Sequence, residues 1–114
     1  MSREAEQRAL AYIRESITLI EGWTARGVSE ALAEELTRDA ILWRLQTLAD
    51  AAANKLSEGL RSRYPEIQWP LIAGFRNVAA HAYMDVRLSQ VAAIIQEDLP
   101  ALRAVVEQEL ARRD

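Results

Sequence analysis

The sequence predicts an all-α protein, an antiparallel helical bundle of about five helices in a single domain over residues 1–114. Three observations indicate this fold class. Half of the 114 residues are hydrophobic, so one core can form without disulfides or bound metal. Apolar residues recur at spacings of three and four, the period of a helix with one buried face. The best strand candidate, residues 69–72, is short and interrupted by a proline.

The first third of the chain predicts two helices. Between Glu4 and Ala25, four apolar residues share one helical face: Ala9, Ile13, Ile17 and Ile20. Gly27 is expected to stop this helix at its C-terminal end. A shorter helix is expected after Ser29, because Ser29 and the glutamates that follow it suit the positive end of a helix.

The clearest helix is expected from Thr37 to about Arg63. Six apolar residues follow one another along one face of it: Ile41, Leu45, Leu48, Ala52, Leu56 and Leu60. Thr37 or Asp39 can cap its start, and the tyrosine-proline pair at residues 64–65 ends it. Arg61 and Arg63 would then lie at the negative pole of this helix.

Prolines divide the second half of the chain. Pro70 suits the first position of a helix that continues through Val78. From Leu88 to Leu110, the apolar spacing predicts either one helix bent at Pro100 or two helices in sequence. No internal repeat or low-complexity linker interrupts this organisation, so one domain is expected.

Composition excludes several kinds of site. The chain has no cysteine, which excludes disulfide scaffolds, zinc–cysteine sites and thiol nucleophiles and fits a reducing compartment. It shows no signal peptide and no apolar run near the roughly 20 residues of a membrane span, so a cytoplasmic protein without membrane contact is expected. The net charge of −3 and the isoelectric point of about 5.2 are acidic. Any contact with nucleic acid must therefore depend on a local basic patch.

Residues 75–83 contain side chains that the packing of a helical bundle does not require. This stretch contains Arg76, Asn77, Tyr83 and the chain's only histidine, His81. Five positions on a regular helix correspond to about 500° of rotation, which leaves the side chains of Arg76 and His81 roughly 140° apart. Either the helix ends between these two residues, or their side chains converge through a partner molecule.

The chemistry of these side chains favours the partner. RNA cleavage without a metal needs a base for the 2′-hydroxyl, an acid for the leaving oxygen and positive charge beside the phosphorane. An imidazole can act as base or acid, but one chain supplies only one imidazole. A twofold dimer would bring two copies of His81 and of Arg76 to a shared cleft. Taken singly, these residues have structural interpretations too: a capping or core histidine, a salt-bridged arginine and, for Tyr83, a packing residue.

The order of Arg76-Asn77 and His81-Ala82-Tyr83 resembles the motif of HepT-like proteins in the HEPN superfamily, an arginine, four residues, a histidine, any residue and a tyrosine. The surrounding landmarks agree with this resemblance. Residues 37–41 and 45–55 resemble the family's long central helix, residues 64–69 and 72–74 its approach to the motif, and residues 98–100 its closing turn. The similarity extends from about Tyr12 to Leu110.

This resemblance implies a helical homodimer that acts as the toxin of a toxin–antitoxin pair. It implies a metal-independent endoribonuclease without a cofactor, whose RNA-cleaving site combines both copies of the motif. Arg76 would stabilise the phosphate, His81 would be the acid–base residue, and Asn77 would be the polar neighbour that orients the site. The antitoxin would be a minimal nucleotidyltransferase (MNT) that transfers AMP from ATP onto Tyr83, and complexes larger than the dimer could form with it. The added bulk and negative charge would repel an RNA phosphate.

The chain departs from the family pattern at two places. Asp50 stands where the family often has glutamate, which puts in doubt any contact that needs the longer carboxylate. Ala79 and Ala80 are small where bulky aliphatic residues are common, so helices could approach more closely or the site could be looser. Arg76, His81 and Tyr83 are all present.

Two other functions stay open. The acidic charge is compatible with a non-catalytic helical binding module that only holds a nucleotidyltransferase partner, and a helical domain that binds nucleotide is the other alternative.

Other conspicuous residues have structural interpretations. The tryptophans are expected in the core or at a dimer interface: Trp23, Trp43 and Trp69. The carboxylates near residue 35 are expected to cap a helix rather than to bind metal: Glu34, Glu35 and Asp39. Arg112 and Arg113 are expected to form a solvated terminus.

Overall fold

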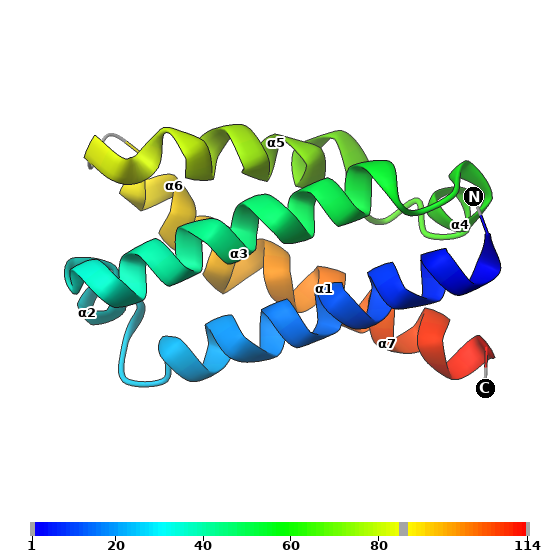
Figure 1. Cartoon of the computed structure of the whole chain (residues 1–114), viewed down its shortest axis with the longest axis horizontal. Coiled ribbons are helices and arrows are strands. Elements are labelled where there is room, and N and C mark those ends of the chain that lie inside the picture. Colours follow the sequence, from blue (N-terminus) through cyan, green and yellow to red (C-terminus); the bar gives the residue numbers. More distant parts are fainter. Residues whose placement is uncertain (1, 85–86, 114) are drawn as a thin grey trace.

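Four long helices form the body of the molecule in the computed structural model, which describes residues 2–84 and 87–113. They are α1 (Arg3–Trp23), α3 (Glu35–Asn54), α5 (Trp69–Ala80) and α7 (Leu99–Arg113). Helices α1 and α5 run in one direction and α3 and α7 in the other, so the bundle is antiparallel (Figure 1). The described part of the chain contains no strand, which confirms the all-α prediction. The principal extents of the molecule are 38 × 23 × 23 Å.

The first helix follows the predicted apolar face. All four predicted core residues of α1 are buried, and the Ser2 hydroxyl caps the helix by accepting a hydrogen bond from the Ala5 amide at 3.0 Å. The helix ends at Trp23, shortly before Gly27. Gly27 has φ of 140°, a conformation that favours glycine, and it begins the short helix α2 (Val28–Ala33).

The helix predicted from Thr37 to Arg63 is two helices. Helix α3 ends at Asn54, and α4 (Glu58–Ser62) begins after Ser57, whose hydroxyl accepts from the Leu60 amide at 3.1 Å. A serine at this position competes with the helix by capping a new one. All six predicted apolar residues are nevertheless buried, because the stripe continues across the break.

The caps of α3 also differ from the prediction. Glu34, rather than Thr37 or Asp39, caps the start of the helix, since its carboxylate accepts from the Thr37 amide at 2.9 Å, and the capping role expected of the carboxylates near residue 35 is confirmed for Glu34. At the other end, the Arg61 guanidinium donates to the Ala53 carbonyl at 3.1 Å. The prediction that Arg61 meets a negative helix pole is therefore correct for α3.

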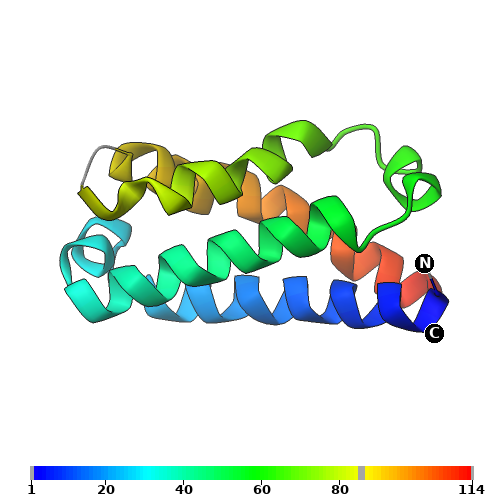
Figure 2. The same ribbon diagram turned by 45° about the horizontal axis from the view of Figure 1, so that its top comes forward.

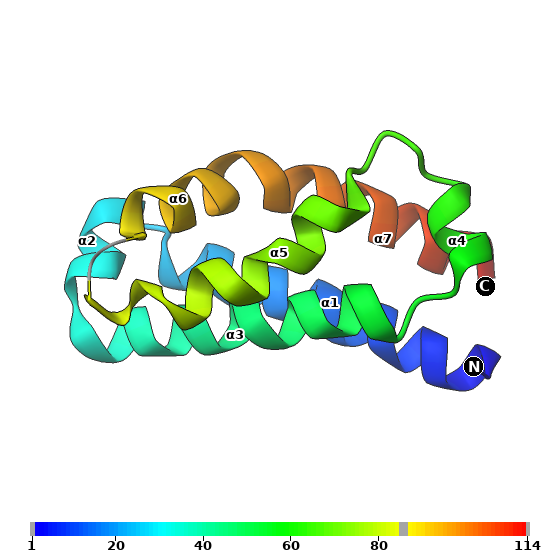
Figure 3. The same ribbon diagram turned by 90° about the horizontal axis from the view of Figure 1, so that it is seen from above.

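The second half of the chain contains α5 and one long helical path. Pro70 is the second residue of α5, one position later than predicted. After a 3-10 turn, η1 (Ala82–Met84), the path consists of α6 (Leu88–Ala93), a π-helical turn η2 (Ile94–Asp98) and α7 (Figure 3). The wide turn directly before Pro100 accommodates a residue that lacks an N–H and crowds the preceding turn. This is the first of the two predicted arrangements, one helix altered near Pro100.

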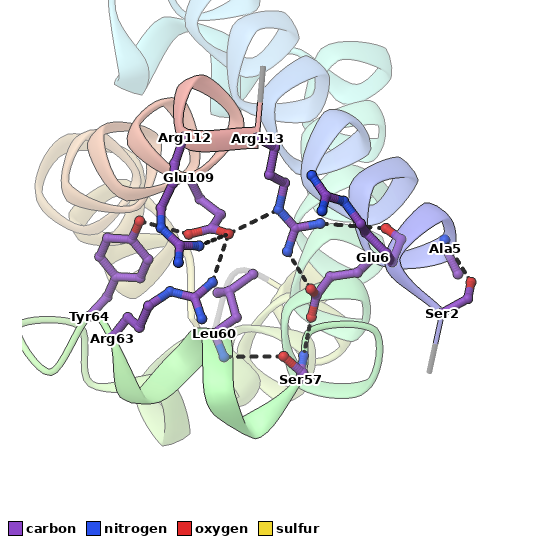
Figure 4. A network of polar contacts seen from close by, with 11 residues as sticks. Ser2, Ala5, Glu6, Ser57, Leu60, Arg63, Tyr64, Glu109, Arg112 and Arg113 are labelled. Atoms are coloured by element: carbon purple, nitrogen blue, oxygen red, sulfur yellow. Dashed lines mark hydrogen bonds and ion pairs between the residues drawn. The ribbon is translucent and has the colours of Figure 1, made fainter.

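A buried polar network joins both chain ends to α4 (Figure 4). Glu109 of α7 is fully buried and accepts from the Tyr64 hydroxyl at 2.9 Å, the Arg63 guanidinium at 2.8 Å and Arg113 Nε at 2.9 Å. Burial raises the pKa of the Glu109 carboxyl, but the hydrogen bonds from Arg113, Tyr64 and Arg63 outweigh burial and hold this pKa below its ordinary value.

Arg113 connects this carboxylate to a second one. Its guanidinium also pairs with Glu6 of α1, and the other carboxylate oxygen of Glu6 accepts from the Ser57 amide at 2.5 Å. Only 8% of the Arg113 side chain is exposed, so the prediction of a solvated terminus is wrong for Arg113, whereas the Arg112 side chain is largely exposed. The network secures one end of the bundle, where α4 and both chain ends lie together (Figures 1 and 2).

Candidate active site

Helix α5 presents the motif on its outer face because its inner face is apolar. Ile72, Phe75 and Ala79 are buried, and α5 packs against α3 along its length. Ala79 is 2% exposed, so the small residue that departs from the family pattern lies in the core between helices. The exposed residues of this part of the helix are Arg76, Asn77 and Ala80.

Arg76 and Asn77 lie on this outer face. Both are exposed, and together with Ala73 and Ala80 they line a shallow hollow of about 290 Å³. These four positions are spaced by three, four and seven residues, which places them on one side of the helix. With alanines on either side, nothing bulky covers the guanidinium or the amide in the hollow.

His81 lies at the C-terminal cap of α5. Its φ of −107° and ψ of 6° leave the helical region, but its backbone N–H still donates to the carbonyls of Asn77 and Val78, at 3.3 Å each. The residue is exposed, so it is not a core histidine, and the capping position is an observed feature of its backbone.

The helix does end between Arg76 and His81, at Ala80, which is the first of the two predicted arrangements. The amide of His81 still donates to carbonyls of the last helical turn, so His81 directly follows the helix that carries Arg76. Among residues 2–84 and 87–113, the side chains of Arg76, Asn77 and His81 make no hydrogen bond or ion pair. Within one chain, the side chains of Arg76, Asn77 and His81 thus lie at one end of the bundle but do not bond to one another.

Tyr83 follows in η1 and is 66% exposed. Its hydroxyl forms no hydrogen bond with another described residue, and Met84 beside it is 69% exposed. The packing interpretation of Tyr83 is therefore wrong within one chain. The phenol is open to a reagent in solution.

Two exposed apolar side chains of α3 lie at the same end of the molecule as the motif. Leu36 is 78% exposed and Trp43 is 63% exposed, and their separation of seven residues places them on one face of the helix. The end of α5 lies beside the first half of α3 in each view (Figures 1 and 3). The sequence analysis did not single out Leu36. Its spacing of seven residues from Trp43, outside the buried apolar face of the helix, could have indicated an exposed apolar pair.

The other tryptophans behave differently. Trp69 is partly buried, and its indole N–H donates to the carbonyls of Arg61 at 3.0 Å and Tyr64 at 3.2 Å. Trp23 is 36% exposed at the end of α1. A core position is therefore wrong for Trp43, and its place in a dimer interface stays a prediction.

The carboxylates near residue 35 form no metal site within the described part of the chain, which holds no group of three or more histidine, aspartate or glutamate residues suited to a metal ion. Asp50 accepts from the Asn54 side chain of its own helix at 2.8 Å. No helix in the described ranges is both long enough and apolar enough to traverse a bilayer.

Comparison with known proteins shows which family the sequence matches. A family model described as "Ribonuclease HepT-like" matches residues 13–109. The "Probable ribonuclease HepT" of Thermococcus cleftensis is 30% identical over 97 residues, 84% of this chain and 87% of that protein. The "Putative RNase MJ1380" of Methanocaldococcus jannaschii is 24% identical over 79 residues, 69% of this chain and 72% of that protein. No solved structure gives a significant match.

Proposed function

Because the chain belongs to the HepT-like ribonuclease family, we propose that it is a metal-independent endoribonuclease whose active site forms between two copies of the chain. The observation that carries this proposal is the exposed motif at the end of α5. It holds an arginine and a single histidine that do not meet within one chain. A twofold axis beside this end would place two guanidinium groups and two imidazoles around one phosphate.

The proposed reaction uses the two imidazoles in different protonation states. One neutral His81 accepts the proton of the RNA 2′-hydroxyl, whose oxygen attacks the adjacent phosphorus. The bond from phosphorus to the 5′-oxygen breaks, and the protonated His81 of the other copy donates its proton to that oxygen. The products are a 2′,3′-cyclic phosphate and a 5′-hydroxyl end. Arg76 stabilises the negative charge that develops on the phosphorane, and Asn77 orients the phosphate in the hollow they share.

The exposed apolar residues support the dimer. Leu36, Trp43 and Met84 lie at the motif end of the bundle and expose large apolar side chains to solvent. Exposed apolar side chains that gather in a patch are typical of interaction surfaces, and tryptophan is enriched in interface centres, so these residues are candidates for a dimer contact. A dimer through this surface would bury the apolar side chains and leave the arginines and histidines lining a cleft.

Mixing wild type with His81→Ala tests the composite site. Equal amounts are allowed to exchange partners, and cleavage of a labelled RNA is measured per total protein. If both copies of His81 are needed, only wild-type dimers are active, so the mixture retains about one quarter of the wild-type rate. Independent protomers would retain about one half. Arg76→Ala alone should also abolish cleavage, and RNA left intact by the wild type would refute the ribonuclease proposal.

The toxin role and its control belong to the same proposal. Tyr83 is accessible two positions after His81, so an MNT-type antitoxin could place its hydroxyl oxygen on the α-phosphorus of ATP. The new oxygen–phosphorus bond replaces the bond to pyrophosphate, and the phenolic proton passes to a base of the transferase. The adenylate adds a negative charge beside the RNA site. With ATP and such a transferase, wild type should gain the mass of one adenylate and lose cleavage, whereas Tyr83→Phe should keep cleaving.

A non-catalytic binding module is the second candidate, favoured by the net charge of −3. This function predicts that expression of the wild type alone does not arrest growth, and that His81→Ala binds the transferase as tightly as the wild type. Growth arrest by the wild type that His81→Ala relieves would exclude it.

A further inference from the structure

A second hollow opens at the motif end of the bundle, between α2, α3 and α6. Its volume is about 480 Å³, and apolar side chains form part of its wall: Leu32, Leu88 and Ala92. The polar groups that line it are the hydroxyls of Ser29 and Ser89 and the guanidinium of Arg38. Helices α2 and α6 and the end of α5 lie together at this end of the molecule in each view (Figures 1 and 3).

Arg38 has an unsatisfied hydrogen-bond donor in this hollow. Its Nε atom is buried and has no hydrogen-bond partner within residues 2–84 and 87–113. An unpaired buried N–H destabilises a folded protein, and more so when the group is charged. Such a group is typical of a site that a ligand completes.

The acidic neighbours of Arg38 do not supply the partner. The Glu34 carboxylate is engaged by the amide and hydroxyl of Thr37, and these bonds keep the pKa of Glu34 below its ordinary value. No ion pair joins Arg38 to Glu35 or Asp39 in the described structure. Among the described residues that line the hollow, Arg38 is the only one with a charged side chain, and its charge is positive.

These features fit a phosphate group. A guanidinium presents its N–H groups in a planar fork that matches two phosphate oxygens, and serine hydroxyls can donate to the remaining oxygens. The apolar wall lowers the local dielectric constant, which strengthens a charge-assisted hydrogen bond. A carboxylate ligand would use the fork but leave the hydroxyls opposite it with less to contact.

We infer that the Arg38 hollow binds a backbone phosphate of single-stranded RNA, at a nucleotide other than the one cleaved. This inference rests on the proposed ribonuclease function and extends it with an RNA contact outside the arginine–histidine motif. It explains how a chain with an acidic net charge holds RNA, since the half-buried Arg38 guanidinium, with its Nε unpaired, places positive charge where the strand passes.

The test measures RNA binding apart from cleavage. Full-length His81→Ala protein is titrated against a labelled single-stranded RNA, and fluorescence anisotropy gives the Kd at several salt concentrations. Adding Arg38→Gln should weaken binding by about tenfold and reduce the slope of log K against log salt by about 0.7, the value for one lost phosphate contact on a single strand. Arg14→Gln is the matched control, since Arg14 is a half-exposed arginine of α1 paired with Glu107.

A second measurement does not depend on the variant. The Arg38 Nε–Hε resonance should shift in saturable fashion when RNA is added to the His81→Ala protein. An unmoved resonance, or equal effects of Arg38→Gln and Arg14→Gln, would overturn the Arg38 site. AMP that binds in an Arg38-dependent way while RNA does not would overturn it in favour of a nucleotide site.

The two proposals fail in distinguishable ways. If the wild type cleaves RNA but Arg38→Gln changes neither affinity nor salt slope, the ribonuclease function stands and the Arg38 site is wrong. If the wild type neither cleaves nor binds RNA, both are wrong.

Discussion

Replacing Glu109 by glutamine tests how much the buried network stabilises the fold. The substitution keeps the shape of the side chain but removes the negative charge that faces three arginines. Loss of one partner from a buried ion pair typically destabilises a protein by about 3–5 kcal/mol. Here Arg63 and Arg112 are exposed enough to return to water, and buried Arg113 keeps its second partner, Glu6. We therefore expect a loss of about 2–3 kcal/mol in the free energy of unfolding.

Urea unfolding followed by circular dichroism at pH 7, with equal protein concentrations, measures this loss. Glu21→Gln is the control, because Glu21 pairs with Arg103 at 2.8 Å on the surface between α1 and α7. Such an exposed pair should contribute less than about 1 kcal/mol. If Glu109→Gln destabilises the protein no more than Glu21→Gln does, the assignment of the network as a main source of stability is wrong.

Three further predictions address acid stability, the break after α3 and the dimer. Burial acts to raise the pKa of Glu6 and Glu109, but their hydrogen bonds with arginine lower both pKa values below the ordinary 4.5. The two carboxylates therefore stabilise the folded chain fully above pH 4.5. This stabilisation is lost as the pH falls through the lowered pKa values. The melting temperature should drop steeply below about pH 4.5, and less steeply in Glu109→Gln. Ser57→Ala should reduce the free energy of unfolding by about 1 kcal/mol through loss of the α4 cap, and urea unfolding should detect no loss if the cap is unimportant. Trp43→Lys should convert dimers to monomers on size-exclusion chromatography and abolish cleavage while circular dichroism shows the helices intact, and an active monomer would contradict the composite site.

Burial was the most predictable part of the fold. The spacing of apolar residues in α1 and α3 predicts which helix faces are buried, because this spacing depends only on residues close together in the sequence. The break at Ser57 escaped prediction because Leu56 and Leu60 keep the same period across it. A local cap decided the conformation there, and periodicity carries no information about caps.

Contacts between distant residues could not be predicted in the same way. In the sequence, Arg113 is one of two arginines near the C-terminus. Its contact with Glu6, 107 positions away, exists only in the folded chain. The same is true of Arg38, whose hollow is formed by helices from three parts of the chain.

The motif of Arg76, His81 and Tyr83 could be predicted in part. Helix geometry predicted that Arg76 and His81 do not face each other on one straight helix, and within the described structure no hydrogen bond joins their side chains. Sequence alone could not decide whether His81 and Tyr83 lie in the core or in solvent, since single polar residues at a helix end occur in both places. The roles proposed for these residues come from the family motif, and the second copy of the chain is proposed from the chemistry.

The buried network and the motif occupy opposite ends of a molecule 38 Å long. Perturbations at sites this far apart, with no shared partner, usually add. A double variant of Glu109→Gln and His81→Ala should therefore unfold as Glu109→Gln does and fail to cleave as His81→Ala does. If the two ends are energetically independent, the end that carries Arg76 and His81 can tolerate substitutions without loss of stability at the other end. Substitutions that change which RNA is cut can accumulate there without weakening the end that holds the chain together.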